Sequence, residues 1–427
     1  MASSPKDFTV AIVGGGMCGL ACAIVLNRAG IDVNVFEAAT KFGEVGAGVG
    51  FGPNSLRALK GLGLYDAALK AANEPPNMRL FRFIAGTGDH ELIYDYANLA
   101  KSEEDQTGFG IYRPAFIDAL TPLMDPSRTH FNKRCISVEK AASDRQLLRF
   151  ADKSTFEADL IIGADGIRSA VRKVIVGDES SCLGFSNTVA CRGLVPIDAL
   201  KAEGMKVPVH TRPHCWTGLG KHLITFPMKN DTLLNVVAFI STPDGSKLSP
   251  EHPQPWVRTA PQQELLNGFQ GFGNDAMTIL KNIKTPSLWS IHTLHPPLKS
   301  FVAGRVVLVG DAAHGMLPHL GAGVGQGFED VYTLYRLLTH PATKKSNLER
   351  ALAIYDDMRP SRANMVLEGS IKAGNVYDGF GETKYSAEDM VTHLTGQWDP
   401  VWFYDIVAEV SDTLKQRENE LFPSATS

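Results

Sequence analysis

The sequence predicts an α/β protein in which a parallel sheet with covering helices is interrupted by a mostly antiparallel sheet and closed by C-terminal helices. Short apolar runs end in glycine turns at the start of the chain, near residue 160 and near residue 310. A region rich in short β runs, from about 180 to 290, separates the last two. Continuous β-branched runs are typical of buried parallel strands, and short runs between turn residues of antiparallel ones. The 427 residues fit two domains of ordinary size.

The first segment predicts a compact βαβ unit. Residues 8–13 form a β-branched apolar run, residues 14–19 break it with glycines, and residues 20–29 continue as a helix that Gly30 ends. Residues 31–36 then form a second apolar run. The order strand, glycine turn, helix and strand indicates a Rossmann-like nucleotide-binding domain.

The glycine turn satisfies the pattern GxGxxG through Gly14, Gly16 and Gly19. The first glycine permits a tight turn, the second lets backbone amides reach a pyrophosphate, and the third lets helix and strand pack closely. The helix N-terminus adds free N–H groups and a positive dipole end. Glu37, which closes the second strand 18 residues after Gly19, can accept both hydroxyls of a ribose. The motif predicts a dinucleotide site and leaves NAD and FAD both open.

Four further runs predict strands of the two sheets. The runs 159–162 and 305–309 each lead into a glycine-aspartate turn, as buried parallel strands do. A strand is also expected around 78–84, inside an otherwise polar stretch, and another over 233–240. The last belongs to the β-rich middle region, which reads as a separate sheet inserted into the nucleotide-binding domain.

Helical patterns dominate the C-terminal part of the chain. One runs from 325 towards 338 and a longer one covers about 347–374. The tail from 387 onwards is rich in aromatic residues and is expected to pack as helices against the body.

Composition excludes several functional classes. Hydrophobic residues make up 44% and charged residues 21%, and the formal net charge is −4, so a nucleic-acid or anionic-membrane partner is not expected. The N-terminus lacks a signal peptide, and no run approaches the roughly 18 to 20 apolar residues of a membrane span. A cytoplasmic location is therefore expected. The six cysteines have no metal-ligand spacing, and Cys18 and Cys22 read as small core residues, so no metal site is predicted.

Two later motifs resemble those of flavoprotein aromatic hydroxylases. Residues 163–166 read Gly-Ala-Asp-Gly, similar to the family's DG motif. Residues 304–314, continuing through Pro318 to the glycine-rich run 321–327, resemble the GD motif. With the GxGxxG turn, the three occur in the family's order along the chain. The sequence therefore resembles the group A FAD-dependent monooxygenases.

Within that group the sequence is most similar to the salicylate hydroxylases. This similarity extends beyond the nucleotide motifs to residues 42–54, 222–227, 235–241 and 317–323. Because 222–241 belongs to the inserted sheet, where the family binds its substrate, the resemblance narrows the subfamily and not only the fold.

The resemblance implies a set of FAD-binding positions. The glycine loop, the acid after the second strand, an arginine that opens a helix and the GD aspartate contact FAD in such enzymes, and two further positions contribute backbone atoms. The matching residues are Gly14, Gly16, Gly19, Glu37, Arg113, Asp311, Gly50 and Val324. Arg113 also allows a plain surface role, and Val324 stands where alanine is common.

Three residues are candidates for substrate chemistry. Arg192 is expected to pair with a carboxylate or phenolate. His222 is expected to orient or deprotonate a phenol, whose pKa near 10 requires such help at neutral pH. His319 lies on the loop that the resemblance places at the flavin edge. A structural salt bridge for the arginine and satisfied core positions for the histidines remain alternatives. Phe226 stands where many relatives carry tyrosine.

The implied activity is hydroxylation of a small phenolic acid, with NADH or NADPH reducing FAD and O₂ as oxidant. The specific expectation is conversion of salicylate to catechol with loss of CO₂. No second glycine fingerprint is present, which fits transient NAD(P)H binding. The alternatives are a dearomatising or heteroaromatic hydroxylase, a flavin-binding protein without turnover and an NAD-dependent dehydrogenase. The sequence gives no prediction of the oligomeric state.

These assignments divide the chain into three kinds of segment. The FAD-binding domain is expected in three parts, the substrate domain in two, and a C-terminal helical segment follows. In that order the segments are 1–75, 106–178 and 291–375; 76–105 and 179–290; and 376–427.

Overall fold

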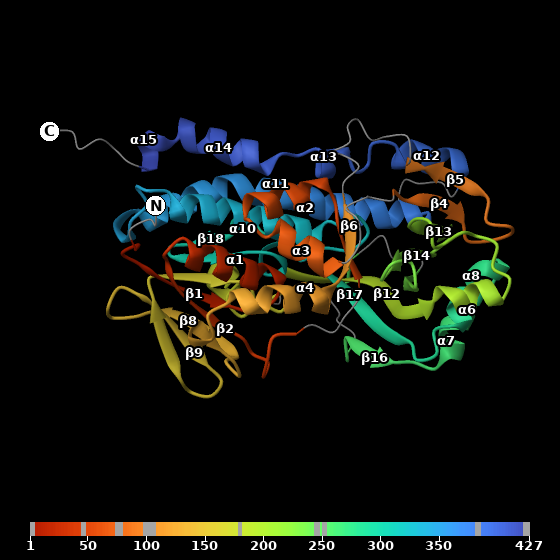
Figure 1. Ribbon diagram of the computed structural model, residues 1–427, viewed down its shortest axis with the longest axis horizontal. Helices are drawn as coiled ribbons and strands as arrows, with labels where there is room; N and C mark the ends of the chain where they lie inside the picture. Colours follow the sequence, from red (N-terminus) through yellow and green to blue (C-terminus); the bar gives the residue numbers. More distant parts are fainter. Residues whose placement is uncertain are drawn as a thin grey trace.

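The computed structural model divides along its long axis into two halves (Figure 1). One half holds β1 (Thr9–Val13) and its neighbours, and the other holds β13 (His214–Gly218) and its neighbours. Helix α11 (Leu348–Asp378) extends from the first half into the second. The structure describes residues 5–43, 48–72, 80–96, 108–177, 182–242, 248–249, 254–380 and 386–421.

The first half is built on a six-stranded sheet. Its strands follow the order β18-β19-β11-β1-β2-β7 and are parallel, except that β18 pairs antiparallel with β19. The strands not yet given are β2 (Asp32–Phe36), β7 (Thr129–His130), β11 (Leu160–Gly163), β18 (Val302–Ala303) and β19 (Val306–Leu308). Val13 pairs with Gly163, which pairs with Leu308, so the strands before the three motifs end side by side.

Helices and a small sheet enclose the six-stranded sheet. Helices α1 (Met17–Arg28) and α10 (Gly323–Thr339) pack together on one side. On the other side, Phe36 of β2 stacks on Phe150 of a three-stranded antiparallel sheet, with ring centroids 4.9 Å apart. The strands of that sheet are β8 (Cys135–Lys140), β9 (Gln146–Phe150) and β10 (Thr155–Ala158).

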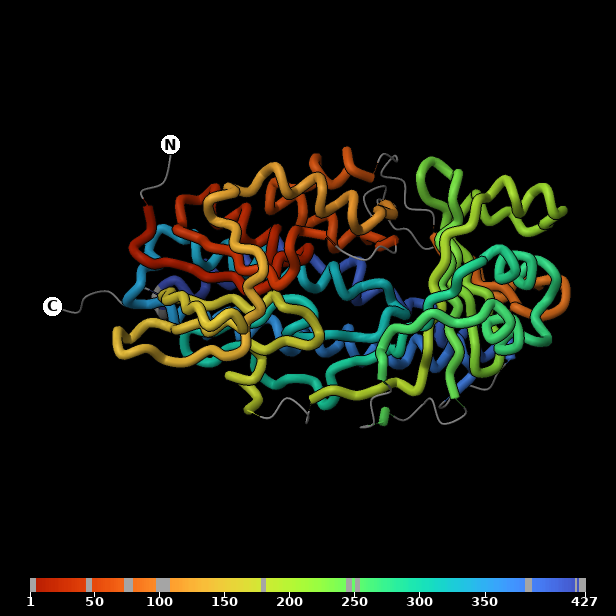
Figure 2. Tube along the Cα trace, turned by 90° about the horizontal axis from the view of Figure 1, so that it is seen from below, coloured from red at the N-terminus to blue at the C-terminus, as the bar shows by residue number. Residues whose placement is uncertain are grey.

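The second half is built on an eight-stranded sheet in the order β16-β17-β12-β15-β14-β13-β4-β5. All neighbours are antiparallel except β13 and β4. Figure 2 shows the segments from about 190 to 290 gathered at one end of the molecule. The remaining strands are β4 (Arg82–Ala85), β5 (Leu92–Asp95), β12 (Leu183–Pro196), β14 (Lys221–Met228), β15 (Leu233–Ser241), β16 (Val257–Thr259) and β17 (Ser287–Leu294).

The two faces of this sheet differ in what covers them. One face carries Trp216, Leu223 and Val236 and packs on three helices in a single apolar core. These helices are α6 (Ile197–Ala202), α7 (Gln262–Gly268) and α8 (Asn274–Lys281). Successive side chains of a strand point to opposite faces, so the residues between these lie on the face that meets α11.

Shorter elements complete the chain. A two-stranded sheet of β3 and β6 lies near the second half, and the C-terminal helices follow the edge of the molecule (Figure 1). These elements are β3 (Gly48–Phe51), α2 (Pro53–Gly61), α3 (Tyr65–Ala72), β6 (Phe109–Tyr112), α4 (Arg113–Leu120), α5 (Lys173–Val176), α9 (Asp311–His314), α12 (Ala387–Leu394), α13 (Asp399–Trp402), α14 (Ile406–Gln416) and α15 (Glu418–Leu421), with 3-10 turns at Thr121–Leu123, Pro126–Arg128 and Lys345–Asn347.

The predicted fold class is confirmed, and the deviations are local. Helix α1 begins at Met17, inside the glycine motif, rather than at residue 20. Helix α11 continues past residue 374 to Asp378, because Gly374 lies inside it and Gly379, with φ of +66°, ends it. The strand expected around 78–84 is β4, and residues 78–79 lie outside the described part, as do 44–47 of the glycine-rich segment. The domain boundaries stay a prediction.

Among the described residues, no helix is both long and apolar enough to cross a membrane.

Candidate active site and nucleotide site

The three glycine-containing motifs meet at the carboxyl edge of the six-stranded sheet. A Cβ atom on Gly14 would overlap the carbonyl oxygen of Ala164 in the second motif. Cys18, in the first turn of α1, lies against both the third motif and α10: a Cβ on Gly310 would come within 3.1 Å of its Sγ atom, and one on Gly327 would overlap it. Glycine is therefore required where these loops approach one another.

Two helix N-termini open at this meeting point without side-chain caps. Gly16 precedes α1 and Ala322 precedes α10, and neither first turn contains an acidic residue. The first-turn N–H groups have no partner inside their own helix and carry the positive end of the dipole. Val324, a predicted backbone contact, lies in the first turn of α10. Paired N-termini of this kind fit a pyrophosphate and other electron-rich cofactor atoms.

Glu37, which the sequence assigns to ribose binding, lies beside the glycine loop. Its Oε2 atom accepts a hydrogen bond from Gly15 N at 2.7 Å, and its Oε1 atom accepts from Ala39 N at 2.7 Å. An ionised carboxylate has about four acceptor positions, so both oxygens keep capacity for ribose hydroxyls.

Three other predicted cofactor positions lie on α9, β3 and α4. Asp311 begins α9 with an exposed side chain that makes no hydrogen bond to the described residues. A Cβ on Gly50 would have open space around it, so the backbone there is accessible. Arg113 is the first residue of α4, as the resemblance implies. The carboxylates of Glu37 and Asp311 can accept from hydroxyl groups, and the uncapped amides can bind phosphates. Together they fit FAD.

His222 and Arg192 lie on the same face of the eight-stranded sheet. His222 of β14 is opposite Phe239 of β15, and Ile224 is opposite Val237, which is opposite Arg192 of β12. Directly paired residues share a face, so both candidates point away from the face that α6, α7 and α8 cover. They are separated by two strand spacings and two residues, roughly 12 Å at the backbone.

His222 is fully buried and has one occupied and one unoccupied ring nitrogen. Its Nδ1 atom lies 2.6 Å from Oδ1 of Asp378, the last residue of α11. Its ring stacks on Phe239 with centroids 4.5 Å apart. Among the described residues, its Nε2 atom has no hydrogen-bond partner. His214 also has one unpaired ring nitrogen, so what distinguishes His222 is the carboxylate on its Nδ1 atom together with the adjacent ring of His319.

Asp378 extends this contact into a chain of hydroxyl groups. Its Oδ2 atom accepts from Ser241 Oγ at 2.7 Å, and Ser241 Oγ lies 2.8 Å from Thr188 Oγ1. A hydroxyl has a single hydrogen, and Ser241 uses its own for Asp378, so the Thr188 hydroxyl either donates to Ser241 or donates to Ser186 O, which lies 3.3 Å from it.

His319 is brought to His222 by a loop fixed at three carbonyl groups. Leu317 O accepts from Ser370 Oγ at 2.5 Å, His319 O from the Tyr377 hydroxyl at 3.2 Å, and Leu320 O from Trp398 Nε1 at 3.1 Å. The His319 and His222 ring centroids are 5.2 Å apart. Burial, and secondarily His222, holds the pKa of His319 well below its ordinary value, so this histidine is neutral.

Arg192 is a partly desolvated cation. Its guanidinium lies 4.9 Å from the Trp289 ring centroid, and its Nε atom has no hydrogen-bond partner among the described residues. Burial lowers its pKa to about 10, and the positive charge of Arg113 contributes. The structure thus brings Arg113 and Arg192, which the sequence assigned to different ligands, close enough for their charges to interact. An anion bound beside Arg192 would offset its desolvation.

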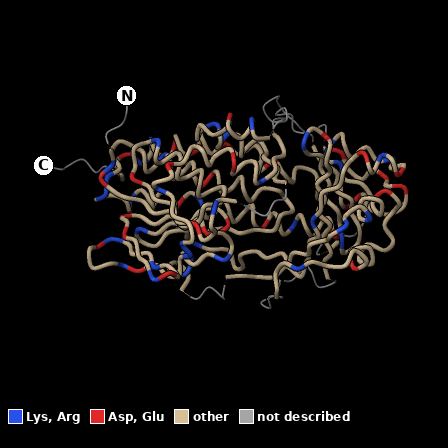
Figure 3. Tube along the Cα trace, turned by 60° about the horizontal axis from the view of Figure 1, so that its bottom comes forward, with Lys and Arg blue, Asp and Glu red and all other residues tan. Residues whose placement is uncertain are grey.

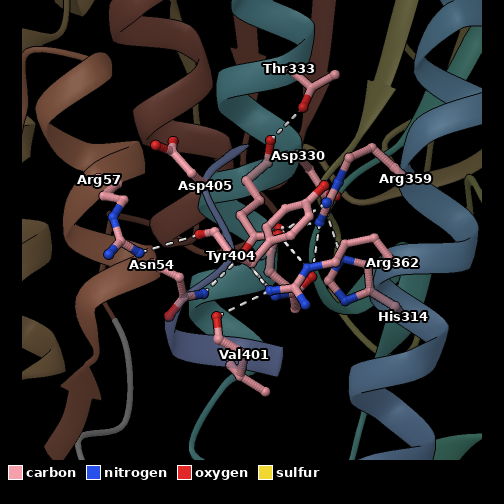
Figure 4. Close-up of polar contacts among 12 residues, drawn as sticks. Asn54, Arg57, His314, Asp330, Thr333, Arg359, Arg362, Val401, Tyr404 and Asp405 are labelled. Atoms are coloured by element: carbon pink, nitrogen blue, oxygen red, sulfur yellow. Dashed lines mark hydrogen bonds and ion pairs between the residues drawn. The ribbon is translucent and has the colours of Figure 1, made fainter. Parts of the chain in front are cut away.

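Sequence analysis missed a second buried cluster, on α10 and α11. Arg359 donates to Glu329 and Asp330 at 3.0 and 2.8 Å, and Arg362 donates to Glu329 at 3.1 Å (Figure 4). All four side chains are buried.

Asp330 connects this cluster to the third motif. Its Oδ2 atom accepts from Gly310 N at 2.8 Å and lies 2.6 Å from His314 Nε2. Burial alone would raise the pKa of Asp330, but His314 and Arg359 lower it, so the carboxylate stays ionised. The cluster fixes the backbone turn that presents Asp311.

Sequence reasoning also missed Asp378, the partner of His222. It stands beside helix-ending Gly379, where an aspartate reads as a turn residue. One weak signal was available, because an anion at a helix C-terminus opposes the dipole.

Neither a metal nor a concentrated charge is evident in the described residues. No group of three or more His, Cys, Asp or Glu side chains there could hold a metal ion. Lys and Arg residues are interspersed with Asp and Glu along both halves (Figure 3).

Comparisons with known proteins agree with this geometry. Residues 7–370 match the family model described as an FAD binding domain. A salicylate hydroxylase from Pseudomonas putida is 39% identical over 96% of each chain, and a 6-methylsalicylate 1-monooxygenase from Aspergillus terreus is 33% identical over 85% of this chain and 81% of its own. The solved structure "Salicylate hydroxylase substrate complex" superposes with a TM-score of 0.83 at 32% identity, covering 96% of this chain and 98% of that one.

Proposed function

This chain belongs to the FAD-dependent monooxygenases, and from that premise we propose that it converts salicylate to catechol and CO₂. FAD, when bound, takes a hydride from NAD(P)H and activates O₂, so that one oxygen atom enters the ring and the other leaves as water. The chain's own residues must bind, orient and ionise the aromatic acid. The expected cytoplasmic location stays a prediction.

The observation that carries the proposal is the unoccupied Nε2 atom of His222 on the sheet face that also carries Arg192. It lies in a fully buried ring whose other nitrogen is held by a carboxylate. A phenol placed against Nε2 would transfer its proton there, giving a phenolate and an imidazolium beside Asp378. General bases of this kind typically contribute about 10² to 10⁴-fold to a rate.

The phenolate directs the chemistry to the carbon that bears the carboxylate. In salicylate the two groups are ortho, so the phenolate raises electron density at that carbon. Bond formation there with oxygen gives a non-aromatic ring, and loss of CO₂ leaves the bonding pair on the ring and restores aromaticity. We assign the carboxylate to Arg192, which has no acid partner among the described residues.

Apolar side chains suit the flat ring between these two groups. Ala190, Phe239, Ile291 and Leu317 form one buried cluster, with Ile224 and Val237 packed against it. Such walls exclude water from the reacting carbon. His319 is neutral beside His222, and we assign it to orienting the hydroxyl group as a hydrogen-bond partner.

A substrate panel tests the proposal. The purified FAD protein would be supplied with salicylate, 6-methylsalicylate, 3-hydroxybenzoate or 4-hydroxybenzoate, each with NADH and O₂, and products would be identified by mass spectrometry. The ortho-hydroxy acids should yield CO₂ and catechols, because only they place the carboxylate on the attacked carbon. Hydroxylation that leaves every carboxylate in place would point to another ring hydroxylase.

A further inference from the structure

The hydrogen bonds around His222 have a direction that fixes its tautomer. An ionised carboxylate only accepts, so the hydrogen shared between His222 Nδ1 and Asp378 Oδ1 at 2.6 Å is carried by the ring. Nδ1 is therefore the N–H nitrogen, and Nε2 carries the lone pair. The second carboxylate oxygen is occupied by the Ser241 hydroxyl at 2.7 Å, so Asp378 has a bound partner on each side.

The placement of Asp378 is unfavourable for its own helix. It is the last residue of α11, where the helix dipole favours a cation, and its side chain has only 4% of its surface exposed. Burial of an anion is also unfavourable unless it is paired and hydrogen-bonded. A carboxylate retained against both effects is explained by what it contacts, which is His222.

The other titratable groups that face this pair add no charge. Burial raises the pKa of Tyr377, on α11, and of Cys215, on β13, well above their ordinary values. His319, on the 315–322 loop, is neutral for the reason given above. Among these described neighbours, Asp378 is the one group that brings a carboxylate into hydrogen-bond contact with His222.

We propose that Asp378 is a positioning residue, which acts through His222 by fixing its Nδ1–H tautomer and stabilising the imidazolium formed when Nε2 takes the phenol proton. The inference rests on the proposed function of His222. In the step, the phenol O–H bond breaks and an Nε2–H bond forms, the electron pair of the O–H bond stays on the phenolate, and Asp378 remains ionised. Ser241 and Thr188 hold the carboxylate in place.

The first test measures ionisation of a bound phenol rather than turnover. The probe is 5-nitrosalicylate, whose phenolate absorbs at longer wavelength than its phenol, followed by difference spectra against the FAD-loaded protein over a pH series. In Asp378→Asn the pKa of the bound probe should rise by about one to two units, a 10- to 100-fold loss of phenolate stabilisation. The kcat for salicylate should fall roughly 10²-fold, with KM changed less than about threefold.

Asp275→Asn is the matched control. Asp275 is also a buried carboxylate of this half, but it accepts from the Lys206 and Val207 amides on the helix-covered face. It should leave the bound probe's pKa unchanged, and Asp378→Glu should recover part of the loss. An Asp378→Asn protein with wild-type FAD content and a wild-type bound pKa would overturn the inference.

A second measurement needs no variant at position 378. The ¹⁵N shifts of the His222 ring in the FAD-loaded wild type, assigned by comparison with His222→Asn, should show a protonated Nδ1 and an unprotonated Nε2. An Nε2–H tautomer would overturn the inference even if Asp378→Asn does not fold. Failure of the wild type to bind the probe or turn over salicylate, with Nδ1 protonated, would instead refute the proposed function and leave the tautomer assignment standing.

Discussion

Two buried charged clusters lie along α11, and they differ in whether every polar atom has a partner. The cluster around Arg359 and Arg362 is closed: apart from His314 Nδ1, each buried side-chain nitrogen or oxygen in it has a partner among the described residues (Figure 4). The cluster around His222 and Asp378 leaves both His222 Nε2 and His319 Nδ1 open. The two are 16 to 19 residues apart on one helix, about 24 to 28 Å at 1.5 Å per residue.

The difference indicates that the closed cluster stabilises the fold and the open cluster suits chemistry. In the closed cluster, opposite charges satisfy one another, and removal of one leaves an uncompensated charge. Asp330 holds the Gly310 amide, and Arg362 donates to Pro400 O at 2.6 Å, so the cluster ties the third motif to the C-terminal segment. In the open cluster, the His222 ring stacks on Phe239 of a buried apolar cluster and keeps an unpaired nitrogen, which suits the transfer of a proton to or from a bound molecule.

The largest effect is expected from opening the closed cluster. Arg359→Met should lower the free energy of unfolding by about 3–5 kcal/mol, because Glu329 and Asp330 then remain buried without their cation. Denaturant unfolding of the FAD-loaded protein measures the change. Arg417→Met removes an ion pair to Asp357 that is partly exposed, and should cost less than about 1 kcal/mol. Equal losses in the two variants would mean that the closed cluster is not a stabilising unit.

In the open cluster, a substitution should change the activity much more than the free energy of unfolding. His222→Asn keeps an N–H donor for Asp378 but removes the base, so kcat with salicylate should fall roughly 10² to 10³-fold. The free energy of unfolding should change by less than about 1.5 kcal/mol, and FAD content should be retained. The deficit should narrow as the pH rises towards about 10, where a free phenol ionises unaided. A loss of activity that merely follows loss of FAD would argue against this role.

Buried His214 tests how much folding stability a neutral histidine loses as the pH falls. Burial, the largest effect on His214, lowers its pKa to about 4, although its bond to Arg212 O opposes the shift. Between pH 6.5 and 4 the unfolded chain therefore binds a proton that the folded protein does not, and stability falls as the pH drops. The wild type should lose up to about 3 kcal/mol relative to His214→Gln over that window. Parallel stability curves for the two proteins would contradict the assigned shift.

The smallest effect is expected at the nucleotide site. Glu37→Ala removes an acceptor for ribose hydroxyls and should weaken FAD binding by about 1.5–3 kcal/mol, or roughly 10- to 100-fold in Kd. Flavin fluorescence on titration measures this. Asp32→Ala, at the start of the strand that Glu37 follows, removes a carboxylate that pairs with Arg128 at 2.5 Å and should retain FAD normally. Tight FAD binding by the Glu37 variant would remove this residue from the cofactor site.

How far the sequence predicts this molecule depends on whether a feature is local. The GxGxxG turn and Glu37 lie within one βαβ unit, and strands β11 and β19 each lead into a glycine-aspartate turn. The nucleotide-binding half and its motifs can therefore be predicted from local patterns. His222 was identified through the family resemblance, but that resemblance did not point to its partner, Asp378.

The partners of the buried side chains come from distant parts of the chain. Asp378 is 156 residues from His222, and Arg359 is 29 to 30 residues from its acids, one helix away. No periodicity specifies such pairings, because they depend on how α11 is laid against two sheets. The proximity of Arg113 and Arg192 was missed for the same reason.

One measurement tests the central claim most directly. Salicylate labelled with ¹³C at the carboxylate would be supplied with NADH, FAD-loaded protein and ¹⁸O₂ in ordinary water. The account predicts one ¹³CO₂ and one catechol carrying a single ¹⁸O atom for each NADH consumed productively. Oxidation of NADH that yields only hydrogen peroxide, or a hydroxylated acid that keeps its ¹³C carboxylate, would contradict decarboxylative hydroxylation at the carbon between His222 and Arg192.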